Sequence, residues 1–511
     1  MTANAVPSKY AATIRSFPRR TLFALALIAA LSVPAAAQDS KKSPNDPPAD
    51  SVTRQRYKLA GAEAAFTVTA GSLPLEDAKG ERQASIFYTA YIRDGAPRDK
   101  RPITFVFNGG PGSSSAYLHI GALGPRVVDF GPEGTIPAPP GKLIDNPDTW
   151  LDLSDLVFID PVGTGYSRPA ATGDDAYKRY WGVKEDLESL ARFIELYLDR
   201  NNRQISPKYI VGESYGGFRA ARLPKLLADD HGIGLAGVFM ISPLLEFRLA
   251  SADNFAVLPD AMRLPSYAAV ELERAGGKPT PESLAPVEKF ALGPYLTTMA
   301  GSEANEKDLQ AIYAQVAKYT GLSVDIVRRS GGRIPPRIFV KELRRDQKLV
   351  LSHFDGSIYA PDPYPNSSKT EGDPIYDGLR TVLTGTITDY LGDKLGVHAG
   401  MPYRVANGQA AGHWNWWSGL YGQGGYQGSG DQLREALAAN RNLKVVIAHG
   451  MTDLVTPYFA SKYVIEHLPP AVLGDRVTLR LYPGGHMMYI RAVSRADLHK
   501  DAVELYRAPA K

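Results

Sequence analysis

The sequence predicts an α/β fold with a mostly parallel central sheet flanked by helices. Three observations predict it. Short apolar runs bounded by turn residues recur along the chain, a helical pattern separates two of them, and the composition supports a large core. Hydrophobic residues make up 44% of the 511 residues and aromatic residues 10%, which excludes the disordered, collagen-like and fibrous classes. This length suits one large fold with an insertion.

The apolar runs have the length and composition of strands that are buried on both faces of a parallel sheet. These runs lie at residues 103–107, 156–159, 209–211, 238–241, 445–448 and 477–481. Two earlier β-rich stretches, near residues 65–70 and 85–93, are expected to pair antiparallel at an edge of the sheet. Between residues 183 and 198 apolar residues recur at helical spacing, so we expect a helix that packs on the sheet.

The alternation of strands and helices breaks between about residues 247 and 432. This stretch contains helical patches, Pro-rich turns and a segment rich in glycine and aromatic residues, and we expect it to form a large cap inserted over one end of the sheet. The predicted organisation is a signal peptide, a flexible linker, the first part of the core, the cap and the second part of the core. Their respective ranges are 1–37, 38–54, 55–247, 248–431 and 432–511.

Residues 1–37 have the three parts of a secretory signal peptide, with arginines before an apolar run at residues 22–31 and a small-residue cleavage site at Ala37. The run is about half of the ~20 residues that a membrane span needs, so no stable membrane insertion is expected. We therefore expect a periplasmic or secreted protein, exported by the general or the twin-arginine route. The polar, Pro-rich residues that follow predict the flexible linker.

The formal net charge of +4 comes from the leader, which holds Lys9, Arg15, Arg19 and Arg20 and no acidic residue. The rest of the chain is formally neutral and lacks a basic stripe, so nucleic-acid binding is not expected. The absence of cysteine excludes thiol catalysis, cysteine-ligated zinc and disulfides. We expect no metal or other cofactor, and the sequence leaves the oligomeric state open.

The strongest motif is GESYGG at residues 212–217, which follows the apolar run at 209–211 and precedes a predicted helix. This is the setting of a nucleophile elbow, where a serine lies on a tight turn between a strand and a helix. Small residues on either side let neighbouring backbone approach, and the helix N-terminus favours developing negative charge. The motif predicts Ser214 as the nucleophile. The alternative is a plain glycine-rich turn.

A second motif, NGGPGSSS at residues 108–115, directly follows the first of the apolar runs. Its glycines allow main-chain N–H groups to face a substrate oxygen without obstruction by a Cβ atom. An oxyanion hole needs such donors, held in place before charge develops. A phosphate-binding loop is the alternative, but the Gly-Lys-Ser/Thr signature of such loops does not follow. The motif therefore predicts an oxyanion hole.

A serine nucleophile needs a base, and the base needs an orienting carboxylate. His486 follows the last apolar run and Asp453 follows the run before it, so both are expected at the same sheet edge as Ser214. The chain order Ser-Asp-His is that of α/β-hydrolases, which makes this the predicted fold class. His449 is the main alternative base. Because it directly ends its strand, we interpret it as support for the Asp453 loop.

Through these motifs the sequence resembles the serine carboxypeptidases, an α/β-hydrolase family. The resemblance is carried by blocks at residues 108–115, 146–150, 160–167, 212–217 and 485–487. It implies the same triad of Ser214, Asp453 and His486. It also implies an oxyanion hole formed by the N–H groups of Gly110 and Tyr215.

The resemblance further implies a secreted enzyme that hydrolyses C-terminal peptide bonds of peptides or proteins through an acyl-enzyme. Asn108, Gly109 and Glu213 would hold the terminal carboxylate of the substrate. Glu213 would do so while protonated, because two bare carboxylates repel each other. Ala122 stands where many family members have an acidic residue, so an esterase or acyltransferase with the same triad is the alternative. A non-catalytic binding protein is a third class, although all three triad candidates are present.

Overall fold

The computed structural model describes residues 43–59, 61–250, 255–301, 305–419 and 427–507. The predicted signal peptide, residues 1–37, lies outside these ranges, as do residues 38–42 of the predicted linker. Residues 51–54 of that linker belong to the first strand.

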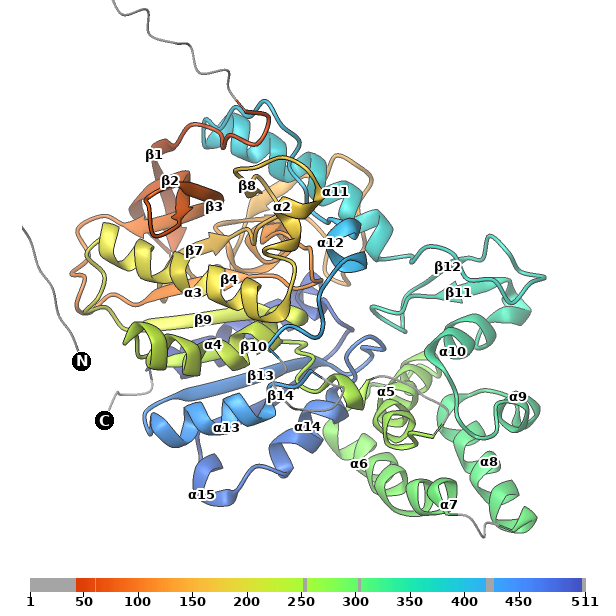
Figure 1. Cartoon of the computed structure of the whole chain (residues 1–511). Coiled ribbons are helices and arrows are strands. Elements are labelled where there is room, and N and C mark those ends of the chain that lie inside the picture. Colours follow the sequence, from red (N-terminus) through yellow and green to blue (C-terminus); the bar gives the residue numbers. More distant parts are fainter. Residues whose placement is uncertain (1–42, 60, 251–254, 302–304, 420–426, 508–511) are drawn as a thin grey trace, which may run out of the picture. The chain divides into compact units, whose positions relative to one another are not determined.

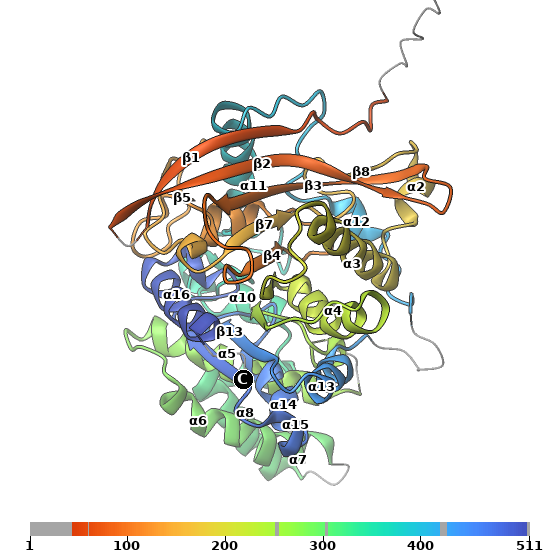
Figure 2. The ribbon, with the colours of Figure 1, turned by 90° about the vertical axis from the view of Figure 1, so that its left-hand side faces the viewer.

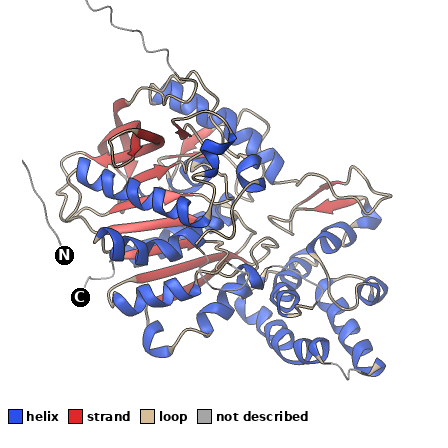
Figure 3. Cartoon of the chain, viewed as in Figure 1, coloured by secondary structure: helices blue, strands red, loops and turns tan. Residues whose placement is uncertain are grey.

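The main sheet confirms the predicted α/β architecture (Figures 1 and 3). In the described part of the chain it has ten strands, of which nine follow the order β1-β2-β3-β7-β4-β9-β10-β13-β14 while β8 pairs with β3. The strands are β1 (Ser51–Leu59), β2 (Ala62–Glu76), β3 (Arg82–Arg93), β4 (Ile103–Phe107), β7 (Asp155–Ile159), β8 (Arg168–Pro169), β9 (Lys208–Glu213), β10 (Gly237–Ile241), β13 (Lys444–Gly450) and β14 (Val477–Tyr482). From β7 to β14 all neighbours are parallel, whereas β1, β2 and β3 pair antiparallel. This strand order is that of the α/β-hydrolase fold.

Every apolar run that predicted a buried strand lies in this sheet. The two earlier β-rich stretches form the antiparallel pair β2–β3, as expected. This pair is not at the edge of the sheet, because β1 pairs with β2 along its whole length and takes the edge position. Three of the four exposed residues of β1 are charged, so this segment contains no apolar run that would predict a strand.

Helices cover both faces of the sheet (Figure 2). Helices α3 (Val183–Arg200), α4 (Tyr215–His231) and α13 (Gly430–Ala439) lie on one face, and α16 (Ala492–Arg507) lies on the other. Successive side chains of a strand point to opposite faces, and in β4 Phe105 and Phe107 pack into the core under α3 and α4 while Val106 packs into the core on the opposite face. Both faces of the strand are therefore buried. Helix α3 is the one that the spacing of apolar residues predicted.

The sequence between β10 and β13 is mainly helical, and Figure 1 shows its helices beside the sheet.

The α-helices in the described part of the chain are α1 (Ala116–Leu118), α2 (Asp174–Lys178), α3 (Val183–Arg200), α4 (Tyr215–His231), α5 (Leu258–Arg274), α6 (Pro281–Phe290), α7 (Leu296–Ala300), α8 (Glu306–Thr320), α9 (Val324–Arg329), α10 (Pro336–Glu342), α11 (Tyr376–Asp389), α12 (Gly408–Gly412), α13 (Gly430–Ala439), α14 (Tyr458–Glu466), α15 (Pro470–Leu473) and α16 (Ala492–Arg507). Two small sheets pair β5 (Arg126–Val128) with β6 (Leu143–Asp145), and β11 (Leu349–Leu351) with β12 (Tyr359–Pro361). Among the described helices, none has both the length and the apolar character needed to cross a membrane.

Two segments between β10 and β13 reach the loops at the carboxyl ends of the strands. One contains Val405 and Asn407, which exchange backbone hydrogen bonds with Ser114 and Gly112 of the glycine-rich loop after β4. The other lies at residues 352–357 and bonds to the loops after β13 and β14. The insertion therefore contributes directly to the walls of the site.

A buried ion pair ties the same glycine-rich loop to two helices. Arg219 in α4 makes a bidentate contact with Asp186 in α3, with nitrogen–oxygen distances of 2.7 and 2.9 Å. The remaining nitrogen of its guanidinium donates to the backbone carbonyl of Asn108. Both side chains are buried, so this pair fixes the carboxyl end of β4 against α3 and α4.

Candidate active site

Ser214 occupies a strained turn between β9 and α4. Its backbone φ is 60° and its ψ is −122°, in a region that residues other than glycine rarely adopt. The turn is held from the neighbouring strand, because the Ser214 N–H donates to the carbonyl of Ile241 in β10 at 2.9 Å. Such strain persists only where the surrounding structure fixes it, and it is common at functional sites.

Glycines on both sides of Ser214 make this turn sterically possible. A Cβ atom at Gly212 would lie 2.0 Å from the carbonyl oxygen of Gly216. A Cβ atom at Gly216 would lie 2.8 Å from the carbonyl oxygen of Phe107, and one at Gly217 would lie 2.4 Å from Cβ of Pro243. Backbone therefore packs directly on backbone around the serine, which is the arrangement that the motif predicted.

The glycine-rich loop after β4 lies against the same turn. A Cβ atom at Gly109 would be 2.4 Å from the backbone nitrogen of Tyr215, so only glycine fits there. Gly110 has a φ of 101°, which favours glycine. Among the described residues, neither the N–H of Gly110 nor that of Tyr215 has a hydrogen-bond acceptor. Both amides are thus available to a substrate oxygen.

His486 and Asp453 form a buried hydrogen-bonded pair, with 2.8 Å between Nδ1 of the imidazole and Oδ2 of the carboxylate. The other carboxylate oxygen of Asp453 accepts from the N–H groups of Val455 and Thr456, at 2.8 and 2.9 Å. The Thr456 hydroxyl lies 2.7 Å from Oδ2. With its Nδ1 proton directed at Asp453, the neutral imidazole has Nε2 free to accept a proton.

The surroundings of His486 favour its protonated form. Burial alone would lower the pKa of this imidazole. The charge of Asp453 and its hydrogen bond outweigh burial, and Glu213 acts in the same direction, so the net effect is a raised pKa. His486 is thus a stronger base than an ordinary buried histidine.

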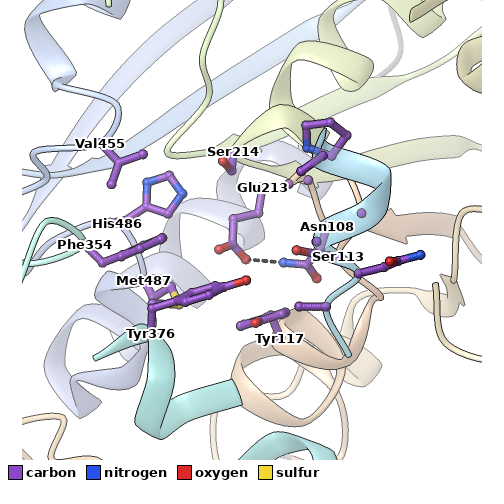
Figure 4. Close-up of a pocket in the computed structure, with 18 residues that line it drawn as sticks. Asn108, Ser113, Tyr117, Glu213, Ser214, Phe354, Tyr376, Val455, His486 and Met487 are labelled. Atoms are coloured by element: carbon purple, nitrogen blue, oxygen red, sulfur yellow. Dashed lines mark hydrogen bonds between the residues drawn. The ribbon is translucent and has the colours of Figure 1, made fainter. Parts of the chain in front are cut away.

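A cavity of about 240 Å³ opens onto these groups (Figure 4). It is lined by Asn108, Gly109, Gly110, Pro111, Gly112, Ser113, Tyr117, Glu213, Ser214, Phe354, Tyr376, Ala406, Asn407, Gly408, Ala411, Val455, His486 and Met487. Among these described lining residues there is no lysine or arginine, and Glu213 is the acidic one. The described lining therefore offers an anionic substrate group no lysine or arginine side chain.

Glu213 is buried beside the nucleophile, and Figure 4 shows its carboxyl group directed toward Asn108. The Asn108 side-chain amide donates to Oε2 of Glu213 at 2.7 Å, and the Tyr489 hydroxyl donates to the same oxygen at 2.9 Å. Burial raises the pKa of Glu213 to about 7, against the lowering effects of His486 and of the two hydrogen bonds. Below that pH the group is a neutral carboxyl that can donate a hydrogen bond.

The structure brings the predicted site residues together at one edge of the sheet. Ser214, His486, Asn108, Gly109, Gly110 and Glu213 all line the cavity. Asp453 lies behind His486, and Tyr215 faces the glycine-rich loop with its backbone nitrogen. The side chain of Tyr215 instead packs edge-on against Trp414 and Trp416, with ring centroids 5.5 and 5.7 Å apart. These two tryptophans therefore form a packed cluster outside the cavity lining.

His449, the alternative base, has a structural partner, and so does His119, which follows the glycine-rich loop. His449 is fully buried, its Nε2 lies 2.8 Å from the Ser461 hydroxyl, and burial lowers its pKa to about 4. His119 bonds through Nε2 to the hydroxyl of Tyr91 at 2.6 Å. Neither histidine is among the described residues that line the cavity. The described residues also contain no group of three or more His, Cys, Asp or Glu that could hold a metal ion.

Several residues of the site were not predicted from the sequence. Thr456 and Tyr489 each lie three residues after a predicted site residue, and that spacing within a loop is the signal that could have suggested them. Phe354 and Tyr376 come from the insertion and reach the cavity only through tertiary packing. Their two rings are stacked with centroids 5.0 Å apart.

The comparison with protein families identifies residues 61–260 as matching the model described as serine carboxypeptidase. This part of the chain is similar to the serine carboxypeptidase family. The matched residues include Ser214, Glu213 and the glycine-rich loop, whereas Asp453 and His486 lie beyond them. The family match therefore does not cover Asp453 and His486, and their placement comes from the structure of the loops after β13 and β14.

Known proteins of this family match the chain over a limited part of their length. "Serine carboxypeptidase-like 44" of Arabidopsis thaliana is 31% identical over 202 residues, covering 37% of this chain and 38% of that protein. "Carboxypeptidase Y homolog" of Arthroderma benhamiae is 30% identical over 138 residues, covering 26% of this chain and 24% of that protein. The chain thus spans about a third of the length of the curated serine carboxypeptidase relatives that it matches.

Solved structures of other hydrolases resemble the chain weakly. Proline iminopeptidase of Mycobacterium smegmatis gives a TM-score of 0.33 at 14% identity, covering 88% of this chain and 99% of that one. A lipase in its open form gives a TM-score of 0.35 at 15% identity, covering 86% of this chain and 99% of that one. At such scores the likeness says nothing about the function of this chain, whose fold class rests on its own strand order.

The contacts of Gly212 predict that Gly212→Ala destabilises the protein. The added Cβ atom would collide with the carbonyl of Gly216, and we expect a loss of about 3 kcal/mol in the free energy of unfolding, the upper range for overpacked cores. Gly234→Ala is the matched control, because its Cβ atom would meet no atom within 4 Å. Urea denaturation of both variants measures the difference. Equal stability of the two would contradict the proposed packing of the turn.

Proposed function

We propose that this protein is a serine-type carboxypeptidase that hydrolyses C-terminal peptide bonds through an acyl-enzyme intermediate. The observation that carries the proposal is a single cavity lined by Ser214, His486 and a buried glutamic acid, Glu213, whose pKa of about 7 allows it to be neutral. A serine with a base supports hydrolysis, and a neutral carboxyl group next to it supports recognition of a free C-terminus. The match of residues 61–260 to the serine carboxypeptidase model supports peptides as the substrates.

In the proposed acylation step, Nε2 of His486 accepts the Ser214 hydroxyl proton while the serine oxygen attacks the carbonyl carbon of the last peptide bond. The carbonyl oxygen becomes negatively charged, and the N–H groups of Gly110 and Tyr215 donate to it. Each such donor is worth roughly 3–4 kcal/mol in the transition state. The C–N bond then breaks as His486 passes its proton to the leaving amino group.

In the proposed deacylation step, His486 takes a proton from water, and the resulting hydroxide attacks the ester carbonyl of the acyl-enzyme. The same two amides stabilise the second oxyanion. The bond to the Ser214 oxygen breaks, and the proton on His486 returns to that oxygen. Asp453 stays ionised throughout and stabilises the imidazolium through its 2.8 Å hydrogen bond.

Recognition of the substrate carboxylate would depend on the protonation of Glu213. No lysine or arginine is found among the described residues that line the cavity, so no fixed cation is available there. Asn108 and Tyr489 both donate to Oε2 of Glu213, which leaves Oε1 to carry the proton. A proton on Oε1 could be donated to the substrate carboxylate, whereas the ionised form of Glu213 would repel it.

A free C-terminal carboxylate should therefore be required for rapid turnover. We expect a peptide with a free C-terminus to lose its last residue. The same peptide with a C-terminal amide should react at least about 10²-fold more slowly, which corresponds to a loss of about 2.7 kcal/mol in binding. Mass spectrometry of the products, with a simple ester assayed alongside, makes the measurement. If the ester turns over rapidly and neither peptide does, the esterase or acyltransferase alternative is favoured. Ala122, where many members of the family that the sequence resembles have an acidic residue, fits that alternative.

The pKa of Glu213 sets the expected pH dependence. On a free-carboxylate peptide, kcat/KM should fall about tenfold per pH unit above pH 7, as Glu213 loses its proton. Glu213→Gln keeps a hydrogen-bond donor that does not titrate, so this decline should disappear in the variant. Assays from pH 5 to 9 on the free and the amidated peptide measure it, with the amidated peptide as the control. An unchanged decline in Glu213→Gln would exclude this role.

We also propose that residues 1–37 direct export of the protein, on the pattern of arginines, apolar run and small residues in their sequence. This proposal does not depend on the site. N-terminal sequencing of the protein from a bacterial periplasm should begin near Gln38. Recovery of the uncleaved chain from the cytoplasm alone would contradict it.

A further inference from the structure

We propose that Asp355, contributed by the insertion, is a positioning residue that holds the Asp453 and His486 loops in register. The inference rests on the proposed function, because it assigns these two loops to catalysis. Asp355 itself is not among the described residues that line the cavity. It acts on the reaction through its neighbours.

The two oxygens of the Asp355 carboxylate bind the two loops separately. Oδ1 accepts the hydroxyl of Thr452 at 2.6 Å, and Oδ2 accepts the backbone N–H of Gly485 at 3.0 Å. Thr452 directly precedes Asp453, and Gly485 directly precedes His486. One buried side chain therefore joins the residue before the proposed orienting carboxylate to the residue before the proposed base.

The backbone around Asp355 fits between the same two loops. The Leu454 N–H donates to the carbonyl of His353 at 3.2 Å, and the Gly356 N–H donates to the carbonyl of Thr452 at 3.0 Å. On the other side, a Cβ atom at Gly485 would lie 2.1 Å from the carbonyl oxygen of Phe354. Residues 353–356 therefore contact both loops, so this segment cannot shift unless one of the loops moves with it.

The charge of Asp355 is compensated within the same cluster. Arg491, which precedes α16, places Nη2 3.2 Å from Oδ2 of Asp355 and Nη1 3.0 Å from Glu273 in α5. Oδ1 also accepts the hydroxyl of Ser357 at 2.7 Å. All of these neighbours donate hydrogen bonds to the Asp355 carboxylate. The side-chain amide of an asparagine at this position would therefore direct its N–H groups at one of these donors.

The consequence of losing these bonds is a change in catalytic geometry more than in substrate binding. A displacement of about 1 Å at a reacting group can reduce the rate by about 10²-fold. The cavity lining that would hold the substrate does not include Asp355 or Thr452. We therefore expect kcat to fall while KM changes little.

The test is Asp355→Asn in the full-length protein, assayed on the free-carboxylate peptide. The concentration of competent sites is first measured by titration with a serine-reactive phosphonate. We expect kcat per titrated site to fall about 10²-fold, with KM within about twofold of the wild type. Asp362→Asn is the matched control, because this buried carboxylate of the same insertion pairs with Lys341 at 2.6 Å and accepts the N–H of Tyr364. The control should lose stability but keep its kcat per titrated site.

A second pair of variants keeps the proposal testable if Asp355→Asn does not fold. Thr452→Val removes the hydroxyl that reaches Asp355 with little change of shape, and Thr452→Ser restores it. We expect kcat to fall in the valine variant and to recover in the serine variant. An unchanged kcat in both Asp355→Asn and Thr452→Val would overturn the proposal. A wild-type protein that neither reacts with the phosphonate nor cleaves the peptide would instead refute the proposed function.

Discussion

The site depends on a close approach of two backbones that carry no side chains at the point of contact. The loop after β4 and the turn after β9 meet at Gly109 and Gly216, where a Cβ atom would lie 2.4 Å from Tyr215 N and 2.8 Å from the carbonyl of Phe107, respectively. Strands β4 and β9 are adjacent and parallel, so both loops leave the same edge of the sheet. This contact places beside the serine the N–H groups of Gly110 and Tyr215, for which the described part of the chain supplies no acceptor. The remaining groups of the site are arranged around it.

The two buried carboxyl groups of the site differ because their surroundings differ. Asp453 accepts two backbone N–H groups, a threonine hydroxyl and the imidazole N–H of His486, so both of its oxygens are hydrogen-bonded. Glu213 receives two hydrogen bonds on one oxygen only, and burial dominates its pKa. The surroundings thus distinguish the carboxyl group that orients His486 from one that can be neutral near pH 7.

The fold and the central residues of the site could be predicted because their signals are local. Apolar runs marked five inner strands and the partly buried edge strand β14, and parallel strands bring their following loops to one edge, so Ser214, Asp453 and His486 were expected to meet. Strand β1 was missed because three of its four exposed residues are charged, so it contains no apolar run. Asp355 was missed because it lies far from both loops in the sequence and reaches them only through the packing of the insertion. No periodicity or motif encodes such a contact.

The most direct test of the account is to label the wild-type protein with a serine-reactive fluorophosphonate and to locate the modification by peptide mass spectrometry. The account predicts a single labelled residue, Ser214, and a loss of roughly 10⁶-fold in peptide turnover for Ser214→Ala. Label on a different serine, or near-normal turnover in that variant, would contradict it.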